Sequence, residues 1–168
     1  MAALHEIAPE EISENVFDLI GKQWALVTAG TKNHFNTMTA SWGGLGVLWG
    51  SPVAFIFVRP QRYTLEFLRK NTGFTLSFYD ESYRKALNLL GTKSGRDGDK
   101  VAEAGMTPVF ADGTTYFQGA KLVLFCEKAY VSHFAPENFV EKETVAKWYP
   151  NQDFHDVLVS KITKVLKA

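Results

Sequence analysis

Residues 36–71 read NTMTASWGGLGVLWGSPVAFIFVRPQRYTLEFLRKN. They combine residues that favour strands, residues that favour turns, and cationic and hydroxyl side chains. Residues 38–41 and 53–58 are rich in β-branched and aromatic residues bounded by Gly, Asn or Pro, which is typical of strands. Glycines, Ser51 and Pro52 interrupt the apolar passage 45–58, which therefore predicts a strand, a turn and a second strand. Thr64 is expected to cap a short helix that runs through Arg69.

Similar patterns extend in both directions from this stretch. The sequence predicts an amphipathic helix over 9–20 with Ile12, Val16, Phe17 and Ile20 on one face, and a second helix at 82–91 that ends at Gly91. Strands are predicted at 24–29, at 74–79, twice within 114–134, and at 156–166. The segment 136–149 is predicted to be helical at both of its ends, with loop in between. About six or seven strands with three or four short helices indicate a mainly β barrel with a few short peripheral helices. A Rossmann sheet is disfavoured, because strands and long helices do not alternate and no GxGxxG is present.

Length and composition predict one domain over residues 1–168. The 18 Lys and Arg residues balance the 18 Asp and Glu residues, so no broad basic surface favours nucleic acid or an anionic membrane. No signal-peptide pattern and no apolar run of membrane-spanning length are present. Cys126 is the only cysteine, which excludes an internal disulfide and favours a reducing, cytoplasmic setting.

Polar residues are unusually frequent in the first strand of the 36–71 stretch. Asn36, Thr37, Thr39 and Ser41 stand where a strand should be apolar on at least one face, and the glycine pair that follows lets a ligand or another backbone approach closely. The alternative is an exposed edge strand followed by a glycine turn. Arg59, Arg62 and Thr64 then bring two guanidinium groups and a hydroxyl to the start of a helix.

That cluster suits a phosphate, since free backbone donors and the helix dipole already favour an anion there. The alternative is a pair of surface arginines in weak ion pairs with Glu66 or Asp80. The loop SGRDGDK, residues 94–100, is too rich in Gly and charge for a regular element, and it could bring further donors to the same anion or be only a solvated turn. The aromatic residues Trp42, Trp49 and Phe67 could flank a planar ring or belong to the core.

Familiar catalytic motifs are missing from the sequence. It contains no HExxH, no GxSxG, no P-loop and no paired cysteines, so metal, hydrolase and nucleoside-triphosphatase chemistry lack support. Four scattered histidines remain, of which His155 is the best candidate to touch a ligand. No side chain is therefore assigned as a catalytic acid or base, and no metal site is expected.

Four ordered blocks carry a resemblance over about residues 22–165: NTMTASWGGLGVLW, PVAFIFVRPQRYTLEFL, the SGRDGDK loop and CEKAYVSHFAPENF. Together they resemble the flavin reductase-like, FMN-binding split-barrel family, closest to its flavoredoxin-like branch. The resemblance implies a split β-barrel homodimer that binds FMN near the subunit interface. The implied cofactor-binding residues are Asn36, Thr37, Met38, Thr39, Ala40, Ser41, Trp42, Arg59, Pro60, Arg62, Tyr63, Thr64, Ser94, Gly95, Arg96, Asp99 and Lys100.

Within that set, the resemblance implies that residues 39–42 line the flavin ring and ribityl chain, largely through backbone groups. The arginines, Tyr63 and Thr64 would meet the ribityl chain and phosphate, and residues of the 94–100 loop would close over it. Two departures from the family pattern stand out. Related reductases often carry a GDHxxxxGxV-like block near the C-terminus, whereas residues 153–162 read DFHDVLVSKI, which keeps His155 but has Phe154 before it and Ser160 where Gly is common. In the 94–100 loop, Gly98 stands where a larger apolar residue is usual. In those reductases the histidine equivalent to His155 is often near the nicotinamide or substrate side of the flavin.

Three functional hypotheses follow. The first is an oxidoreductase in which NAD(P)H reduces bound FMN, and the second is a flavoredoxin-like electron carrier that exchanges electrons with a redox protein partner. In both, the cofactor carries the chemistry, which accounts for the missing catalytic motif. The third is a scaffold that binds another planar ligand.

Overall fold

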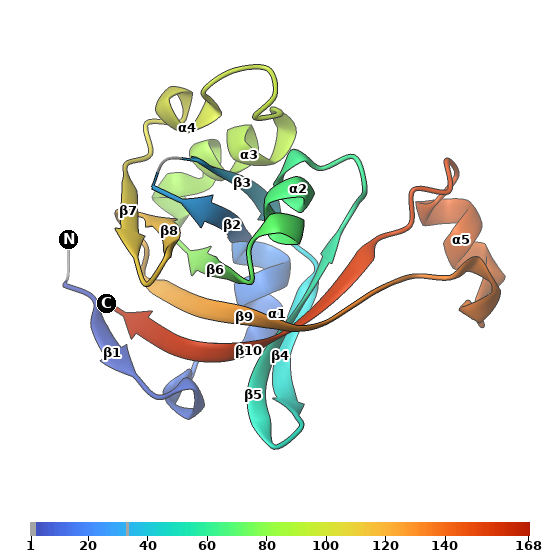
Figure 1. Ribbon diagram of the computed structural model, residues 1–168, viewed down its shortest axis with the longest axis horizontal. Coiled ribbons are helices and arrows are strands. Elements are labelled where there is room, and N and C mark those ends of the chain that lie inside the picture. The colour runs from blue at the N-terminus through green and yellow to red at the C-terminus, as the bar shows by residue number, and fades with distance from the viewer. Residues whose placement is uncertain (1–2, 33) are drawn as a thin grey trace.

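The computed structural model describes residues 3–32 and 34–168 (Figure 1). The strands in these residues are β1 (His5–Ile7), β2 (Ala25–Thr31), β3 (His34–Ala40), β4 (Gly43–Leu48), β5 (Ser51–Val58), β6 (Gly73–Phe78), β7 (Pro108–Ala111), β8 (Thr114–Phe117), β9 (Leu122–His133) and β10 (Asp156–Lys167). The helices are α1 (Val16–Asp18), α2 (Tyr63–Lys70), α3 (Arg84–Thr92), α4 (Lys100–Glu103) and α5 (Lys142–Trp148). Further helical segments are the 3-10 turns η1 (Pro9–Glu11), η3 (Glu81–Tyr83) and η4 (Pro136–Asn138) and the π-helical turn η2 (Leu19–Gln23).

The main sheet is antiparallel and has the order β3-β2-β6-β9-β10-β5-β4, with β1 added to β10. β3 and β4 lie at opposite ends of this order, although only Ser41 and Trp42 separate them in the chain. Such a short link spans only about 10 Å, so the sheet must curl until its two edges approach each other. The sheet does not close, and the predicted mainly β split barrel with short peripheral helices is confirmed.

Two hydrophobic clusters lie on the two faces of the sheet. Leu26 and Val27 are neighbours in β2, yet Val27 packs in the larger cluster with Phe74 and Leu124, whereas Leu26 packs in the second cluster with Leu87. This alternation is the period of two expected of a strand that is covered on both faces. The long strands β9 and β10 pair over most of their length and change register twice. Such bulges bend strands, which lets β9 and β10 follow the curvature of the sheet (Figure 1).

The helix expected over residues 9–20 is wrong. The chain forms η1, passes through Ile12 with an extended backbone, and starts α1 only after Asn15. The Asn15 side chain accepts hydrogen bonds from the backbone N–H groups of Phe17 and Asp18, so it caps a new helix in mid-segment. As a result Phe17, expected on the apolar face, is 86% exposed.

The other predicted elements are present with shifted ends. Strands 24–29, 38–41 and 74–79 correspond to β2, β3 and β6, and helix 82–91 divides into η3 and α3, which continues past Gly91 to Thr92. Thr64 does not cap α2: Arg62 holds the cap position, and the buried Thr64 hydroxyl contacts Asn36 instead. The tertiary hydrogen bond explains why a residue that favours caps stands inside the first turn.

The predicted strand, turn and strand within 45–58 is confirmed as the β4–β5 hairpin. Leu48 pairs with Ser51, which leaves Trp49 and Gly50 as a two-residue turn in which both residues have positive φ, 52° and 67°. Such turns match the twist of the flanking strands. No helix among residues 3–32 and 34–168 combines the length and apolar character needed to cross a membrane.

Replacement of Gly43 by Ala tests the tight start of β4. Gly43 has a φ of +153°, and a Cβ atom there would lie 2.6 Å from the carbonyl oxygen of Phe55 on the paired strand. We expect G43A to lower the free energy of unfolding by about 2 kcal/mol, measured by urea denaturation. The control is G21A, because a Cβ at Gly21 meets nothing within 4 Å. Equal stability of the two variants would contradict the close β4–β5 contact.

Candidate functional site

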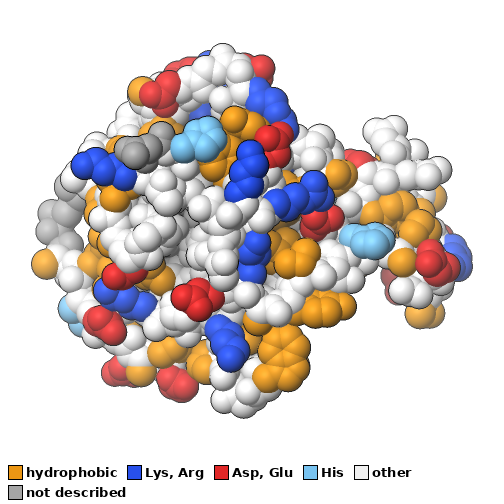
Figure 2. Space-filling view, viewed as in Figure 1, with side chains coloured by type: hydrophobic (Ala, Val, Ile, Leu, Met, Phe, Trp, Pro, Cys, Tyr) orange, Lys and Arg blue, Asp and Glu red, His pale blue; other side chains and the backbone are white. Residues whose placement is uncertain are grey.

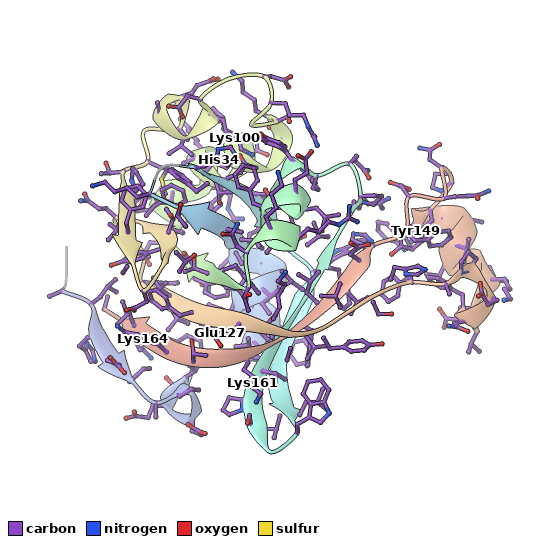
Figure 3. All side chains as sticks on the ribbon, in the orientation of Figure 1. His34, Lys100, Glu127, Tyr149, Lys161 and Lys164 are labelled. Carbon is purple, nitrogen blue, oxygen red and sulfur yellow. The ribbon has the colours of Figure 1, made fainter. Side chains whose placement is uncertain are left out.

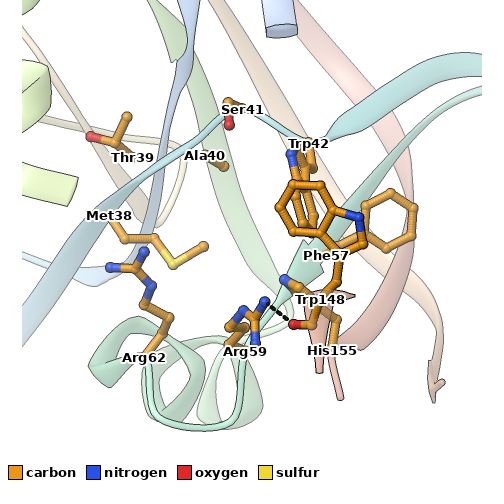
Figure 4. Close-up of a pocket in the computed structure, with 10 residues that line it drawn as sticks. All are labelled: Met38, Thr39, Ala40, Ser41, Trp42, Phe57, Arg59, Arg62, Trp148 and His155. Atoms are coloured by element: carbon orange, nitrogen blue, oxygen red, sulfur yellow. Dashed lines mark hydrogen bonds between the residues drawn. The ribbon is translucent and has the colours of Figure 1, made fainter. Parts of the chain in front are cut away.

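A groove of about 270 Å³ lies beside the open edge of the barrel (Figure 4). Its lining residues come from the end of β3, from the link to β4, from β5 and the turn after it, and from the α5 region. They are Met38, Thr39, Ala40, Ser41, Trp42, Phe57, Arg59, Arg62, Trp148 and His155. The groove therefore joins segments from opposite ends of the sheet, and we call it the edge groove.

The end of β3 contributes backbone groups to the edge groove. In the described part of the chain β3 pairs with β2 alone, so one edge of its backbone is free of strand partners. The Thr39 hydroxyl donates to the carbonyl of Leu87 in α3 at 2.5 Å, so this side chain is engaged elsewhere. An edge strand offers a row of N–H and C=O groups. Those groups suit the edge of a flat heterocycle, which carries its own donors and acceptors.

A second hollow of about 190 Å³ adjoins the edge groove and shares Met38, Arg59 and Arg62 with it. Its lining adds residues from β3, from the turn before α2, from α2 itself and from the 92–100 segment. They are Asn36, Gln61, Tyr63, Thr64, Thr92, Lys93, Ser94, Gly95 and Lys100. We call it the cation hollow.

Two positive charges in the cation hollow have no anionic partner among the described residues. Arg62 is half-buried and donates to the carbonyl of Gly91 at 2.5 Å. Lys100 is 4% exposed and donates to the carbonyls of Leu90 and Lys93 at 2.7 and 2.9 Å. Burial, followed by the charge of Arg62, lowers the pKa of Lys100 to about 8. Burial and the charge of Arg59 lower the pKa of Arg62.

A buried cation and a half-buried one that repel each other are costly unless an anion joins them. The donor set around them fits a phosphate, since the hydroxyls of Thr64 and Ser94 also line the hollow. The Thr64 oxygen accepts a 2.8 Å hydrogen bond from the Asn36 amide, which leaves the Thr64 proton free to donate. The residues present therefore suit the phosphate end of FMN.

Gly95 closes the 94–100 loop over this hollow. A Cβ atom at Gly95 would lie 2.2 Å from the Asn36 Oδ1 atom and 3.2 Å from the Tyr63 ring. Only glycine allows the loop to approach β3 and α2 this closely. Figure 3 shows Lys100 at the end of this loop, close to α3 and β3.

Arg59 faces a different partner from the one expected. Its guanidinium pairs with Asp153 and donates to the carbonyl of Trp148 at 2.8 Å (Figure 4). Gln61 donates to the same Asp153 oxygen at 2.9 Å. Hydrogen bonds from Gln61 and Arg59 lower the pKa of Asp153, so its carboxylate stays charged and neutralises Arg59. Arg59 therefore ties the segment after α5 to the groove.

Four of the expected cofactor residues line neither hollow. Arg96 pairs with Glu66 and stacks on the Tyr63 ring at 4.5 Å. Thr37 is fully buried, with its hydroxyl bonded to Thr28 at 2.8 Å. Asp99 accepts from the backbone N–H of Ala102 at 3.0 Å, which starts α4. Pro60 lies in the turn between β5 and α2.

Sequence reasoning left out several lining residues. Phe57 alternates with buried residues along β5, and its contact with the groove depends on which face of the strand is open. Trp148 is the last residue of α5 and lies far away in the sequence. The only sequence signal for it is a large aromatic residue at the end of an otherwise polar helix. Of the aromatic candidates, Trp42 lines the groove, whereas Phe67 is buried in the core and Trp49 lies in the hairpin turn.

The aromatic end of the edge groove consists of Trp42, Phe57, Trp148 and His155 (Figure 4). The Trp42 ring meets the Trp148 ring edge-on at 5.1 Å and the His155 ring at 5.3 Å. His155 is 5% exposed, and burial, followed by the charge of Arg59, lowers its pKa to about 4. His155 is therefore neutral at pH 7. Among the described residues, no group of three His, Cys, Asp or Glu side chains is arranged to hold a metal ion.

An open antiparallel barrel with a groove at its split defines a protein of the split-barrel class. Residues 17–165 match the family described as "Flavin reductase like domain", and the chain belongs to this family. No curated protein matches the chain in sequence.

Several solved structures share the fold. An FMN-binding domain of a flavin reductase-like enzyme from Shewanella baltica is 14% identical with a TM-score of 0.71, and the match covers 98% of this chain and 77% of that one. Flavoredoxin from Methanosarcina acetivorans is 20% identical with a TM-score of 0.69, covering 96% and 76%. An NADH:FAD oxidoreductase from Streptomyces globisporus is 16% identical with a TM-score of 0.66, covering 87% and 75%.

The buried neutral His155 predicts a specific loss of stability in acid. The unfolded chain binds a proton at the ordinary pKa of 6.5 and the folded chain only near 4. Stability is therefore present above pH 6.5 and lost as the pH falls towards 4, by on the order of 3 kcal/mol. The charged or titratable groups around the ring are Arg59, Arg62, Tyr149 and Asp153.

The measurement is urea denaturation of the wild type and of H155Q between pH 7 and pH 4. The wild type should lose more stability than H155Q over this range. Parallel losses in the two proteins would show that His155 titrates normally.

Proposed function

We propose that this chain binds FMN and that NAD(P)H reduces the bound cofactor. The observation that carries the proposal is the pair of cations next to a groove with a free strand edge: half-buried Arg62 and buried Lys100, neither of which has an anionic partner among the described residues. A ligand that satisfies both features needs a phosphate at one end and a flat heterocycle at the other. FMN has this form, and family membership supports the choice.

Each part of the site would have its own task. Arg62, Lys100 and the hydroxyls of Thr64 and Ser94 would hold the phosphate. The backbone of residues 39–42 would orient the ring along the edge of β3. When bound, FMN supplies the acceptance and release of hydride or electrons. Trp42, Phe57 and Trp148 would exclude water from one end of the groove.

An electron carrier is the alternative function. Flavoredoxins from Methanosarcina acetivorans and Desulfovibrio vulgaris are among the solved structures with this fold. In that case bound FMN would exchange electrons with a redox protein partner. The two functions share the site and differ in whether nicotinamide reacts.

We also propose that the chain acts as a homodimer. Phe17 on α1 is 86% exposed, and Val47 and Trp49 at the β4–β5 hairpin are 78% and 58% exposed. Figure 2 shows hydrophobic side chains at the surface near this hairpin. Exposed apolar residues such as these favour a protein partner, and a second copy is the simplest one. The buried single Cys126 supports a reducing, cytoplasmic setting.

Replacement of Arg62 tests the phosphate assignment. We expect R62A to weaken FMN binding by about tenfold or more, because a charge-assisted contact is lost. The measurement is titration of FMN, followed by quenching of its fluorescence. The control is R69A, which removes the same charge from the last turn of α2, where Arg69 is exposed and paired with Asp156. Equal FMN affinity in both variants would place the phosphate elsewhere.

Anaerobic mixing with NADH or NADPH tests the reductase. If nicotinamide is the reductant, the absorbance of bound FMN near 450 nm should bleach within seconds at about millimolar nicotinamide, the upper end of usual KM values. Dithionite serves as the control that shows the cofactor can be reduced. Bleaching by dithionite but by neither nicotinamide would contradict the reductase and support the carrier.

A further inference from the structure

A separate cavity of about 350 Å³ lies under the small hairpin β7–β8. Residues of this hairpin line it together with residues of β1, β6, β9 and β10. It shares no lining residue with the edge groove or with the cation hollow. In Figure 3, Lys164 and Glu127 mark its position, and Lys100 and Tyr149 lie in other parts of the molecule. We call it the hairpin cavity.

The strands β9 and β10 supply an aromatic ring to the hairpin cavity. Phe125 and Glu127 are two residues apart in β9, so their side chains lie on the same face of the sheet. Lys164 stands opposite Phe125 in β10, and its Nζ atom lies 5.5 Å from the centre of the Phe125 ring. The face of an aromatic ring attracts cations. This wall of the cavity therefore already holds one ammonium group.

The carboxylates around the hairpin cavity outnumber the cations. Lys164 donates to Asp112 at 3.0 Å and lies 3.8 Å from an oxygen of Glu6. The hydrogen bond to Asp112 raises the pKa of Lys164, which therefore stays charged at pH 7. Glu127 also lines the cavity, and Lys161, which stands opposite it in β10, does not. Three lining carboxylates against one lining ammonium leave an excess of two negative charges.

Thr114 adds a buried hydroxyl that lacks a partner. The residue is 5% exposed, and its Oγ1 atom forms no hydrogen bond within residues 3–32 and 34–168. The next residue, Thr115, faces the other side of β8, where its hydroxyl donates to the carbonyl of Gly30 at 3.2 Å. Thr114 therefore shares its side of β8 with Tyr116, whose ring meets the Phe125 ring at 6.0 Å. This is the side of the hairpin cavity.

An unsatisfied buried hydroxyl is costly, and a ligand that donates a hydrogen bond to it would reduce that cost. Together with the excess of negative charge, the Thr114 oxygen favours a cationic donor. The Phe125 ring favours the same kind of ligand.

A metal ion does not fit this arrangement. Among the described residues, no three His, Cys, Asp or Glu side chains are arranged to hold one. The carboxylates instead come from three separate elements, β1, the β7–β8 turn and β9. Between them the cavity has the size of a site for a small organic molecule. A ligand with two charges and an apolar stem could reach carboxylates on different elements.

We propose that the hairpin cavity binds a short aliphatic diamine, with one ammonium group bonded to the Thr114 hydroxyl and the other held by the acidic residues Glu6 and Glu127. The stem between the two charges would lie along the Phe125 ring. This site is additional to the proposed function and does not rest on it, because the cavity is separate from the residues assigned to FMN.

The first test titrates 1,4-diaminobutane at pH 7 and follows the threonine methyl groups by ¹H–¹³C correlation. The Thr114 methyl signal should shift, whereas that of Thr144 on α5 should not. The matched ligands are 1-aminobutane and 1,4-butanediol, which have the same stem with one charge and with none. The diamine should bind about fivefold more tightly than the monoamine, as expected for a second partly exposed charge contact. An unshifted Thr114 signal, or equal affinity for the diamine and the diol, would overturn the proposal.

The second test uses the variants T114V and E127Q. T114V replaces the hydroxyl by a methyl group of similar size, so diamine binding, followed at the methyl signals of position 114, should weaken about fivefold. Without ligand, T114V should be at least as stable as the wild type in urea, because the unsatisfied hydroxyl is removed. E127Q should weaken diamine binding about threefold. Its control is E143Q, because Glu143 is exposed on α5 and does not line the cavity.

Unchanged diamine affinity in T114V, or equal affinities in E127Q and E143Q, would overturn the proposal. FMN binding is followed by visible absorbance in the same samples, with and without the diamine. A protein that binds FMN and not the diamine would contradict this inference alone. A protein that binds the diamine and not FMN would contradict the proposed function and support the hairpin cavity as a separate site.

Discussion

The two-residue link between β3 and β4 is the constraint on which the rest of the structure depends. Ser41 and Trp42 connect strands that stand at opposite ends of the sheet order, so the sheet has to curl and both edges have to meet at this link. In the described part of the chain β3 pairs with β2 along one edge only, and the Thr39 side chain is engaged with the carbonyl of Leu87 in α3. The edge of β3 therefore remains accessible at its end, and the edge groove forms there.

The cationic side chains around this edge differ in whether they have an anionic partner. Arg59 forms an ion pair with Asp153 and Arg96 forms one with Glu66, so neither offers a free charge to a ligand. Arg62 and Lys100 lack such a partner among the described residues; Arg62 is half-buried and Lys100 is withdrawn from water. The low pKa of Lys100 reflects this electrostatic strain. A bound phosphate would relieve it, which is why the cation hollow, rather than the number of arginines, supports the cofactor assignment.

Much of the fold and part of the site followed from local sequence. Strand alternation and the glycine turn predicted the hairpin, and the order of the polar strand, the arginines and the 94–100 loop indicated one cradle. The break at Asn15 could not be predicted with the same ease, because periodicity continued through a residue that caps a new helix. The partner of Arg59 is Asp153, and the contact of His155 with Tyr149 depends on how the α5 segment folds back. Such contacts depend on tertiary geometry, which a single sequence does not contain.

The pKa of Lys100 with and without FMN tests the central claim most directly, and it can be followed by NMR of a protein labelled at lysine. Without ligand the pKa should be near 8. A phosphate dianion in contact with Lys100 stabilises its charged form, so FMN should raise this pKa by at least about one unit, and FMN affinity should fall as the pH rises above 8. An FMN-saturated protein whose Lys100 pKa stays unchanged would contradict the account.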